Sequence, residues 1–197
     1  RSFHEAPHVT YTVEIDAQSL KQAREKVLPV IQDKMGVRVT LTDMIIKACA
    51  MALSEVPEIN ARWDEEKIRL LEDINIGMAT ATDRGLIVPV IRNADRKTIR
   101  EISKETKNLV SKAKNRALTH EQVSGGTFTV SNMGMFNIES FSQIINPPES
   151  AILGVGSIME RPRPVNGEIR IRPIMKLCLT WDHRVMDGIP PAKFLNR

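Results

Sequence analysis

The feature that most constrains the fold is a long run of strand-forming residues near the C-terminus. Asn166-Gly167 is a dipeptide typical of a tight hairpin turn. The residues that follow it, from Ile169 to Trp181, are mostly apolar, and several of them are β-branched. Such a run predicts a long strand. The strand ends directly before Asp182 and His183, so a reaction that uses His183 would take place where the strand ends.

Other segments with strand or helix patterns are intermixed along the chain. Strands are predicted over residues 9–15, 74–82, 86–91, 127–131 and 151–158, and a short hairpin over residues 62–71. Helices are predicted after Asp16, over residues 44–53, and after the capping box Thr98-Ile99-Arg100-Glu101. The helix over residues 44–53 is apolar nearly all round, which predicts burial. Because strands and helices do not alternate strictly, we predict an α/β (α+β) two-layer sandwich, with a mixed sheet and helices on one face.

Charge and composition narrow the class of ligand. The 197 residues carry a formal net charge of +4 and only 4% aromatic residues, which leaves little for base stacking and disfavours nucleic-acid binding. The densest basic patch contains Lys104, Lys107, Lys112, Lys114 and Arg116 on a predicted helix, together with Glu101 and Glu105. A solvated helix face is the favoured interpretation of this patch over a site for an anionic partner. The mild positive excess is still compatible with a phosphorylated ligand such as a nucleotide-bearing cofactor.

The two cysteines and the hydrophobic pattern suggest a reducing, membrane-free setting. Cys49 and Cys178 both lie in apolar surroundings, so we predict two buried thiols and neither a disulfide nor a metal pair. No apolar run approaches the ~20 residues that a membrane span needs. No set of His and Cys residues has metal-ligand spacing, so no metal site is predicted. We expect a cytoplasmic protein, or one of the mitochondrial matrix if the source is eukaryotic.

His183 is the candidate catalytic residue. A histidine at a strand end can be held in one orientation, and its ordinary pKa of about 6.5 suits a general base at neutral pH. Ser131 also lies at a predicted strand end, and two nearby strand ends on one sheet could bring the two side chains together, although the sequence alone does not require it. Ser131 would then be either the nucleophile of a Ser-His-Asp triad with Asp187 or a hydroxyl donor to an oxyanion. The plain alternatives are a structural histidine beside an acid and a turn-forming serine.

Several stretches together resemble the catalytic domain of the dihydrolipoamide acyltransferases of 2-oxo acid dehydrogenase complexes. These stretches are Asp182-His183-Arg184-Val185-Met186-Asp187-Gly188, Phe128-Thr129-Val130-Ser131-Asn132-Met133-Gly134-Met135-Phe136, Ile145-Asn146-Pro147-Pro148-Glu149-Ser150-Ala151-Ile152-Leu153-Gly154-Val155-Gly156, Thr82-Asp83-Arg84-Gly85-Leu86-Ile87-Val88-Pro89-Val90-Ile91 and Ala6-Pro7-His8-Val9-Thr10. The resemblance covers essentially the whole chain. The His-x-x-x-Asp-Gly pattern alone is loose, whereas long matches in the same order are specific.

The resemblance implies a fold like that of chloramphenicol acetyltransferase and trimers with active sites between subunits. It assigns His183 as the general base, Ser131 as the hydroxyl that stabilises the oxyanion, and Asp187 as the residue that maintains the site. His183 and Ser131 would come from different subunits, so a monomer would be inactive. Coenzyme A is the implied substrate at one end of a channel. A lipoyl group carried on another domain enters at the other end, and no metal takes part.

The resemblance also implies partners and an assembly. Trimers would build a larger hollow core that works with a lipoyl domain and with 2-oxo acid decarboxylase and dihydrolipoamide dehydrogenase subunits. Residues 1–197 are expected to form one acyltransferase domain, a fragment of a longer chain in which lipoyl and subunit-binding domains lie elsewhere. A branched-chain acyl or acetyl group is favoured over succinyl by Phe194-Leu195-Asn196 and Pro147-Pro148. Pro190-Pro191 is a less usual pair, expected to alter the helix that follows.

Two other functions compete with acyl transfer in such a complex. One is a non-catalytic core scaffold that recruits dehydrogenase subunits, but such a scaffold would be expected to have lost His183 or Ser131. The other is a small-molecule acetyltransferase of the same fold, which the stretches outside the histidine motif disfavour.

Overall fold

The structure is a computed structural model that describes residues 2–35 and 38–197. The helices are α1 (Ser2–Glu5), α2 (Gln18–Met35), α3 (Leu41–Glu55), α4 (Ile99–Lys114) and α5 (Ile189–Leu195). The strands are β1 (His8–Asp16), β2 (Ala61–Asp64), β3 (Lys67–Leu70), β4 (Ile76–Met78), β5 (Thr80–Thr82), β6 (Gly85–Ile87), β7 (Val90–Ile91), β8 (Phe128–Asn132), β9 (Ala151–Val155), β10 (Met159–Val165) and β11 (Glu168–Asp182). Short 3-10 helices span Pro57–Ile59, His120–Gln122 and Gly134–Phe136.

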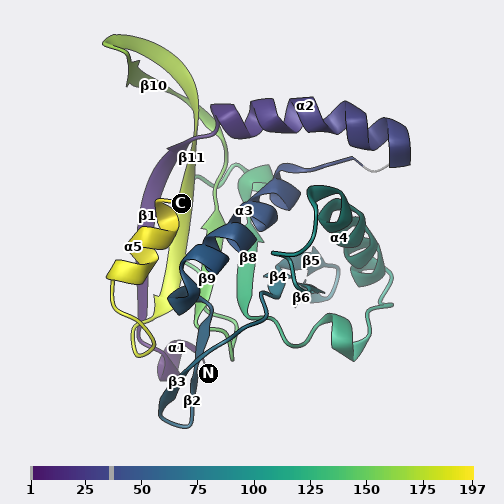
Figure 1. Cartoon of the computed structure of the whole chain (residues 1–197), viewed down its shortest axis with the longest axis vertical. Helices are drawn as coiled ribbons and strands as arrows, with labels where there is room; N and C mark the ends of the chain where they lie inside the picture. Colours follow the sequence, from purple (N-terminus) through teal and green to yellow (C-terminus); the bar gives the residue numbers. More distant parts are fainter. Residues whose placement is uncertain (1, 36–37) are drawn as a thin grey trace.

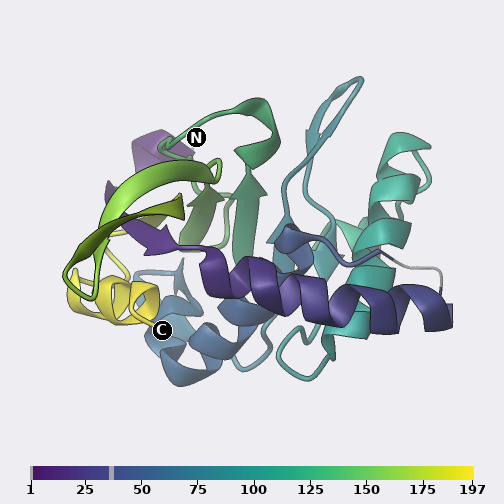
Figure 2. The same ribbon diagram turned by 90° about the horizontal axis from the view of Figure 1, so that it is seen from above.

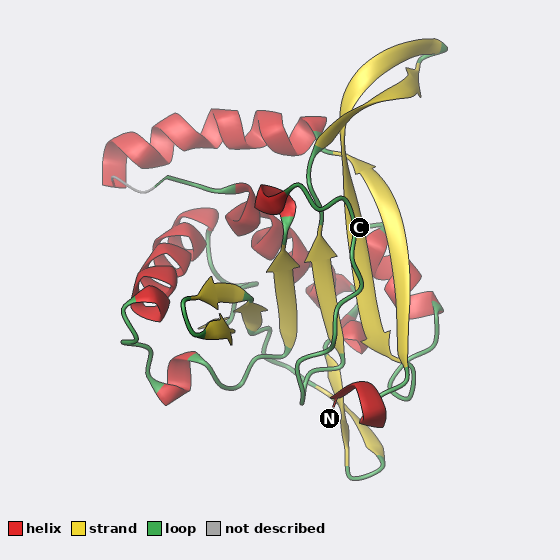
Figure 3. Cartoon of the chain, turned by 180° about the vertical axis from the view of Figure 1, so that it is seen from behind, coloured by secondary structure: helices red, strands yellow, loops and turns green. Residues whose placement is uncertain are grey.

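The predicted long strand is β11, which pairs with β1, β9 and β10 in the main sheet. In the described residues, seven strands form one mixed sheet in the order β1-β11-β9-β8-β4-β7, and β10 pairs with the first half of β11. β11 is antiparallel to both β1 and β9, whereas β8 is parallel to β9 and β4. Asn166 and Gly167 both have positive φ, as the tight turn between β10 and β11 requires. Figure 3 shows β8 and β9 pointing opposite to β11.

Helices cover one face of the sheet, as predicted. Figures 1 and 2 place α3 and α5 on the same side of the strands. Leu53 of α3 and Phe194 of α5 pack there against sheet residues such as Phe128 and Trp181 in one apolar core. The segment of residues 137–150 crosses the opposite face, where Gln143 accepts a hydrogen bond from the Thr180 hydroxyl at 3.1 Å.

The helix starts follow from local hydrogen bonds. Thr98 and Glu101 form the predicted capping box at the start of α4. A second capping box joins Thr40 and Asp43 at the start of α3. Each box satisfies backbone N–H groups that have no partner in the first turn of a helix. Ile102 and Leu109 of α4 are buried, as the amphipathic pattern predicts.

Three sequence-based predictions need correction. The two runs expected as single strands over residues 74–82 and 86–91 each break in the middle: β4 and β7 stay in the main sheet, and β5 pairs only with β6. Pro89, which has no N–H to donate, lies at the second break. α3 is not buried all round, because Met51 is 54% exposed on its outer side. Pro190 and Pro191 do not alter α5, because they lie in its first turn, where prolines fit.

Candidate active site

The turn after β11 holds His183 on a fixed backbone. The His183 N–H donates a hydrogen bond to the Pro7 carbonyl at 2.9 Å, and the Asp182 N–H donates to the Ser150 carbonyl at 2.8 Å. These bonds anchor the turn to the start of β1 and to the residue before β9. The His183 side chain is exposed. Its imidazole is therefore open to a group that arrives from outside the chain.

Asp182 and Arg184 clamp the backbone on either side of His183. Asp182 is buried, and its carboxylate accepts hydrogen bonds from the Arg184 backbone N–H at 3.0 Å, from Nε at 3.0 Å and from Nη2 at 2.7 Å. The hydrogen bond to Asp182 raises the pKa of Arg184. The guanidinium also lies 5.3 Å from the ring centroid of Trp63, within cation–π range. Sequence analysis missed this clamp, although the Asp-His-Arg spacing was visible.

Asp187 does not orient the imidazole. Its side chain is exposed, and its Oδ1 accepts the Ile189 N–H at 3.0 Å at the start of α5. Within residues 2–35 and 38–197, no hydrogen bond joins Asp187 to His183. Asp187 thus shapes the turn into α5, and the geometry of a Ser-His-Asp triad is not present within one chain.

Ser131 lies at the opposite end of the sheet from His183. Ser131 on β8 pairs with Gly154 on β9, and Gly154 pairs with Cys178 on β11. His183 follows Cys178 by five residues, about 17 Å along a strand that rises about 3.3 Å per residue. The expectation that neighbouring strand ends bring Ser131 and His183 together is therefore wrong within one chain. The physical reason is that β8 and β11 run in opposite directions, so their C-termini lie at opposite ends of the strands in the sheet.

Ser131 lines a cavity of about 620 Å³. Apolar walls come from Met78, Val110, Met133 and Phe136, and small polar side chains lie among them. This volume and this mixed lining are typical of a site for a small molecule. Asn132, next to Ser131, fixes the turn at the cavity, because its Nδ2 donates to Thr42 Oγ1 at 2.9 Å and its Oδ1 accepts the Gly134 N–H at 2.8 Å.

A buried carboxylate stiffens the wall of the same cavity. Asp43 accepts hydrogen bonds from the Ser103 hydroxyl at 3.0 Å, from the Thr106 hydroxyl at 2.6 Å and from the Thr40 N–H at 2.8 Å. These contacts join the start of α3 to the inner face of α4. A buried charge that is fully hydrogen-bonded holds its surroundings in one arrangement.

Three exposed cations stand at the mouth of the cavity. Arg38 precedes α3, and Lys107 and Lys114 lie on α4. The expectation that the basic residues of α4 form only a solvated face therefore needs correction for these two lysines. Lys104 does not line the cavity, and Arg116 forms an ion pair with Asp83 at 2.8 Å. A cation rim of this kind favours an anionic ligand.

Glu149 lies beside a second, smaller cavity of about 280 Å³. Its carboxylate accepts hydrogen bonds from Thr129 Oγ1 at 2.5 Å and from Asn146 Nδ2 at 3.1 Å. Burial raises the pKa of Glu149 to about 7 despite these hydrogen bonds, which lower it. A Cβ on Gly126 would come within 2.6 Å of Glu149 Oε1, so glycine allows this close approach.

The cysteines behave as predicted. Cys49 and Cys178 are both buried and free. Burial raises the pKa of the Cys49 thiol to about 12, so this thiol stays protonated at neutral pH. Across the described residues there is no group of His, Cys, Asp and Glu side chains suited to a metal ion. No helix of that same part is long and apolar enough to cross a bilayer.

The chain is similar over its full length to a known family. Residues 1–197 match the family model described as 2-oxoacid dehydrogenases acyltransferase (catalytic domain). The dihydrolipoyllysine-residue acetyltransferase component of the pyruvate dehydrogenase complex of Rickettsia conorii is 42% identical, over 96% of this chain and 46% of the relative. The lipoamide acyltransferase component of the branched-chain alpha-keto acid dehydrogenase complex of Bacillus subtilis is 41% identical, over 100% and 47%. The chain thus spans about half the length of the curated relatives it matches.

Solved structures agree in fold. A structure of Azotobacter vinelandii dihydrolipoamide acetyltransferase, determined to investigate one serine, one histidine and one asparagine in its catalytic mechanism, has a TM-score of 0.95 at 35% identity, covering 100% of this chain and 82% of that chain. The cubic core of a pyruvate dehydrogenase multienzyme complex has a TM-score of 0.94 at 34% identity, covering 100% and 81%. Chloramphenicol acetyltransferase has a TM-score of 0.60 at 15% identity, covering 98% and 86%. The predicted fold of that type is confirmed.

Proposed function

This chain belongs to the family of 2-oxoacid dehydrogenase acyltransferase catalytic domains, and from that membership we propose that it transfers acyl groups between dihydrolipoamide and coenzyme A. The observation that carries the proposal is the separation of His183 from Ser131. The exposed imidazole of His183 lies at one end of the strands, and the Ser131 hydroxyl lies in a cavity at the other end. The two groups can act on one substrate only when two copies of the chain meet.

The proposed site therefore forms between subunits, with His183 from one copy and Ser131 from the next. A heterologous contact closes into a ring when the rotation between copies allows it, and we propose a trimer that builds a larger core. The similarity to the cubic core supports this assembly. We propose a lipoyl domain, a 2-oxo acid decarboxylase and a dihydrolipoamide dehydrogenase as the partners of that core.

The spacing of the residues supports their roles. In the Azotobacter vinelandii protein, the serine and histidine under study are 52 positions apart, and the asparagine follows the histidine by four. In this chain Ser131 and His183 are also 52 positions apart, and Asp187 follows His183 by four. An aspartate thus stands where that protein has an asparagine. Its hydrogen bond to the Ile189 N–H supports a structural role for Asp187.

The proposed mechanism begins with a proton transfer at His183. A free thiol has a pKa near 8.5, so only a few per cent is thiolate at neutral pH. The neutral imidazole takes the thiol proton while the sulfur attacks the thioester carbonyl. The Ser131 hydroxyl of the neighbouring copy donates a hydrogen bond to the oxyanion, worth roughly 2–4 kcal/mol in comparable sites. When the intermediate collapses, the leaving thiolate recovers the proton from His183. One thioester replaces another, so the reaction is reversible.

The cavity at Ser131 suits coenzyme A. Its apolar and small polar walls match an extended thiol arm, and Arg38, Lys107 and Lys114 offer positive charge to phosphate groups at the mouth. We favour acetyl or a branched-chain acyl group as the cargo. One acetyltransferase and one branched-chain acyltransferase among the relatives have nearly equal identity to this chain, which supports either choice.

The test is thioester transfer by the assembled protein. Dihydrolipoamide is offered acetyl-, isobutyryl-, isovaleryl- and succinyl-coenzyme A, with His183→Ala as the blank. We expect transfer with the acetyl or branched-chain donors and a loss of at least a hundredfold in the variant. A folded and assembled protein that transfers none of the four groups would instead support the non-catalytic scaffold. Transfer to small amines or alcohols in preference to dihydrolipoamide would indicate a small-molecule acetyltransferase.

A further inference from the structure

The imidazole ring of His8 makes two hydrogen bonds, donating one and accepting the other. Its Nδ1 lies 2.7 Å from the Ala6 carbonyl oxygen, and its Nε2 lies 3.1 Å from the Ile145 backbone nitrogen. A carbonyl oxygen can only accept, so Nδ1 must carry a proton. A backbone N–H can only donate, so Nε2 must offer its lone pair. These partners assign one neutral tautomer, with the proton on Nδ1.

His8 lies next to the groups that hold His183. Pro7, the preceding residue, provides the carbonyl that accepts the His183 N–H at 2.9 Å. His8 itself pairs with Asp182 in the register of β1 and β11. The hydrogen bond from Nδ1 to the Ala6 carbonyl bridges over Pro7, so it restrains the backbone on both sides of the Pro7 carbonyl. His8 therefore stands directly behind the backbone of the proposed general base.

The other nitrogen connects this corner to the segment of residues 137–150. That segment leaves the 3-10 helix that follows Ser131 and β8, and it returns at Ser150, whose carbonyl accepts the Asp182 N–H at 2.8 Å. His8 fixes it at Ile145, and Asp182 fixes it at Ser150. One imidazole thus joins the start of β1, the His183 turn and the segment that covers the back of the sheet.

We propose that His8 is a positioning residue for His183, acting as the neutral Nδ1–H tautomer. The inference rests on the proposed acyl transfer. His8 touches no substrate; it fixes the Pro7 carbonyl, and Pro7 fixes the backbone from which the His183 imidazole extends. A small displacement of a general base costs rate steeply, because proton transfer needs hydrogen-bond distance and alignment. His8 lines neither of the two cavities, so substrate binding there should change little.

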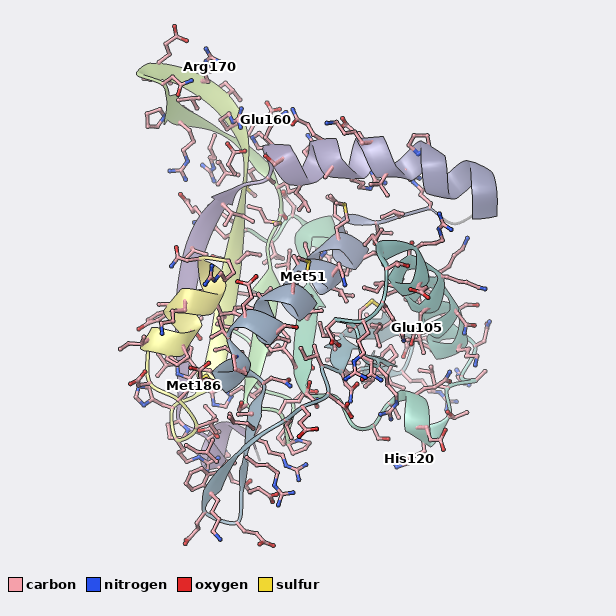
Figure 4. All side chains as sticks on the ribbon, in the orientation of Figure 1. Met51, Glu105, His120, Glu160, Arg170 and Met186 are labelled. Atoms are coloured by element: carbon pink, nitrogen blue, oxygen red, sulfur yellow. The ribbon has the colours of Figure 1, made fainter. Side chains whose placement is uncertain are left out.

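Three substitutions separate the two hydrogen bonds. His8→Asn places an amide N–H near the position of Nδ1 and keeps the donor to Ala6. His8→Gln places an amide oxygen near the position of Nε2 and keeps the acceptor for Ile145. His8→Ala removes both. His120→Asn is the matched control, because His120 is exposed on the connection between α4 and β8. Figure 4 shows it far from Met186, which lies in the His183 turn.

We measure kcat and KM for thioester transfer on assembled protein, together with hydrogen exchange of the peptide that contains Ile145. We expect His8→Ala to lower kcat by about ten- to a hundredfold while KM changes less than twofold. His8→Asn should retain more of kcat than His8→Ala. Exchange at Ile145 should accelerate in His8→Ala and His8→Asn but much less in His8→Gln. The control should match the wild type in every measurement.

The outcomes distinguish this inference from the proposed function. A wild-type protein without transfer would overturn the proposed function itself. An active wild type whose three His8 variants keep kcat within twofold would overturn only the role of His8. A rise in KM with unchanged kcat would also contradict it, because that result points to substrate binding. Equal exchange at Ile145 in all variants would contradict the assigned tautomer.

Discussion

At the residue scale, the pair formed by Asp182 and Arg184 fixes the backbone on either side of His183. Arg184 reaches back to the carboxylate of Asp182 and also stacks over Trp63. Arg184→Lys keeps the charge but loses the planar two-point contact and the stacking. We therefore expect kcat to fall about tenfold with a small change in KM. Steady-state transfer assays measure this effect. Arg96→Lys, at an exposed ion pair, is the control, and equal kcat in both variants would contradict the clamp.

Glu149 gives a second prediction at this scale. Burial raises its pKa from an ordinary value of 4.5 to about 7. Between these values the folded protein binds a proton that the unfolded chain has released, so stability falls as the pH rises from 4.5 to 7 and then levels off. Glu149→Gln removes this loss, which amounts to about 3 kcal/mol at most.

Denaturation curves at pH 5 and pH 8 test the Glu149 prediction. The variant should gain on the wild type between these two values, whichever protein is more stable at pH 5. Glu105→Gln, at an ion pair on the surface of α4, controls for the loss of one carboxylate. Parallel stability profiles for Glu149→Gln and the wild type would show that Glu149 is ionised in the folded protein throughout this range.

The sequence predicts those properties of single residues that depend on their neighbours along the chain. The position of His183 after a strand, the burial of Cys49 and the capping by Thr98 depend on neighbouring residues, and all three predictions are confirmed. The contacts of His8 with Ile145 and of Arg184 with Trp63 join positions more than a hundred residues apart. No pattern within one segment carries information about such pairs.

At the scale of elements, α4 presents two different faces. Lys107 and Lys114 border the cavity that contains Ser131, whereas Lys104 does not. The double substitution Lys107→Ala, Lys114→Ala should raise the KM for coenzyme A about fivefold to tenfold, because exposed charges attract phosphate groups modestly. kcat should stay within twofold.

Kinetics over a range of salt concentrations check the role of these lysines. Salt screens exposed charges, so the difference in KM between the double variant and the wild type should shrink as salt rises. Lys104→Ala should behave like the wild type at every salt concentration. An equal rise in KM for Lys104→Ala would mean that the general charge of the protein, and not the cavity rim, attracts the ligand.

Element types were predictable where the periodicity was long. β11, α4 and the β10–β11 turn appear as expected. The breaks in the strands over residues 74–82 and 86–91 were not predictable, because β5 and β6 leave the sheet to form a wall of the cavity. The outer side of α3 was misjudged for a related reason. An apolar sequence does not reveal whether the chain itself or another molecule covers a helix face.

At the scale of the whole molecule, strand direction separates the two proposed catalytic groups. Ser131 and His183 each follow from a local pattern, but whether they meet depends on the relative direction of β8 and β11. In the order β11-β9-β8, β9 is parallel to β8 and antiparallel to β11, so the C-termini of β8 and β11 lie at opposite ends of the strands. Local sequence patterns do not predict the relative direction of these strands. Because of this separation, the proposed site needs two copies of the chain.

A complementation experiment tests this central claim most directly. His183→Ala and Ser131→Ala proteins are each prepared, shown to be inactive, then dissociated, mixed in equal amounts and reassembled. A site between subunits takes His183 from one copy and Ser131 from the next, so after random reassembly about one quarter of all sites regain both groups. We predict recovery of about a quarter of wild-type turnover. Mixed assemblies that form fully and remain inactive would contradict a site shared between subunits.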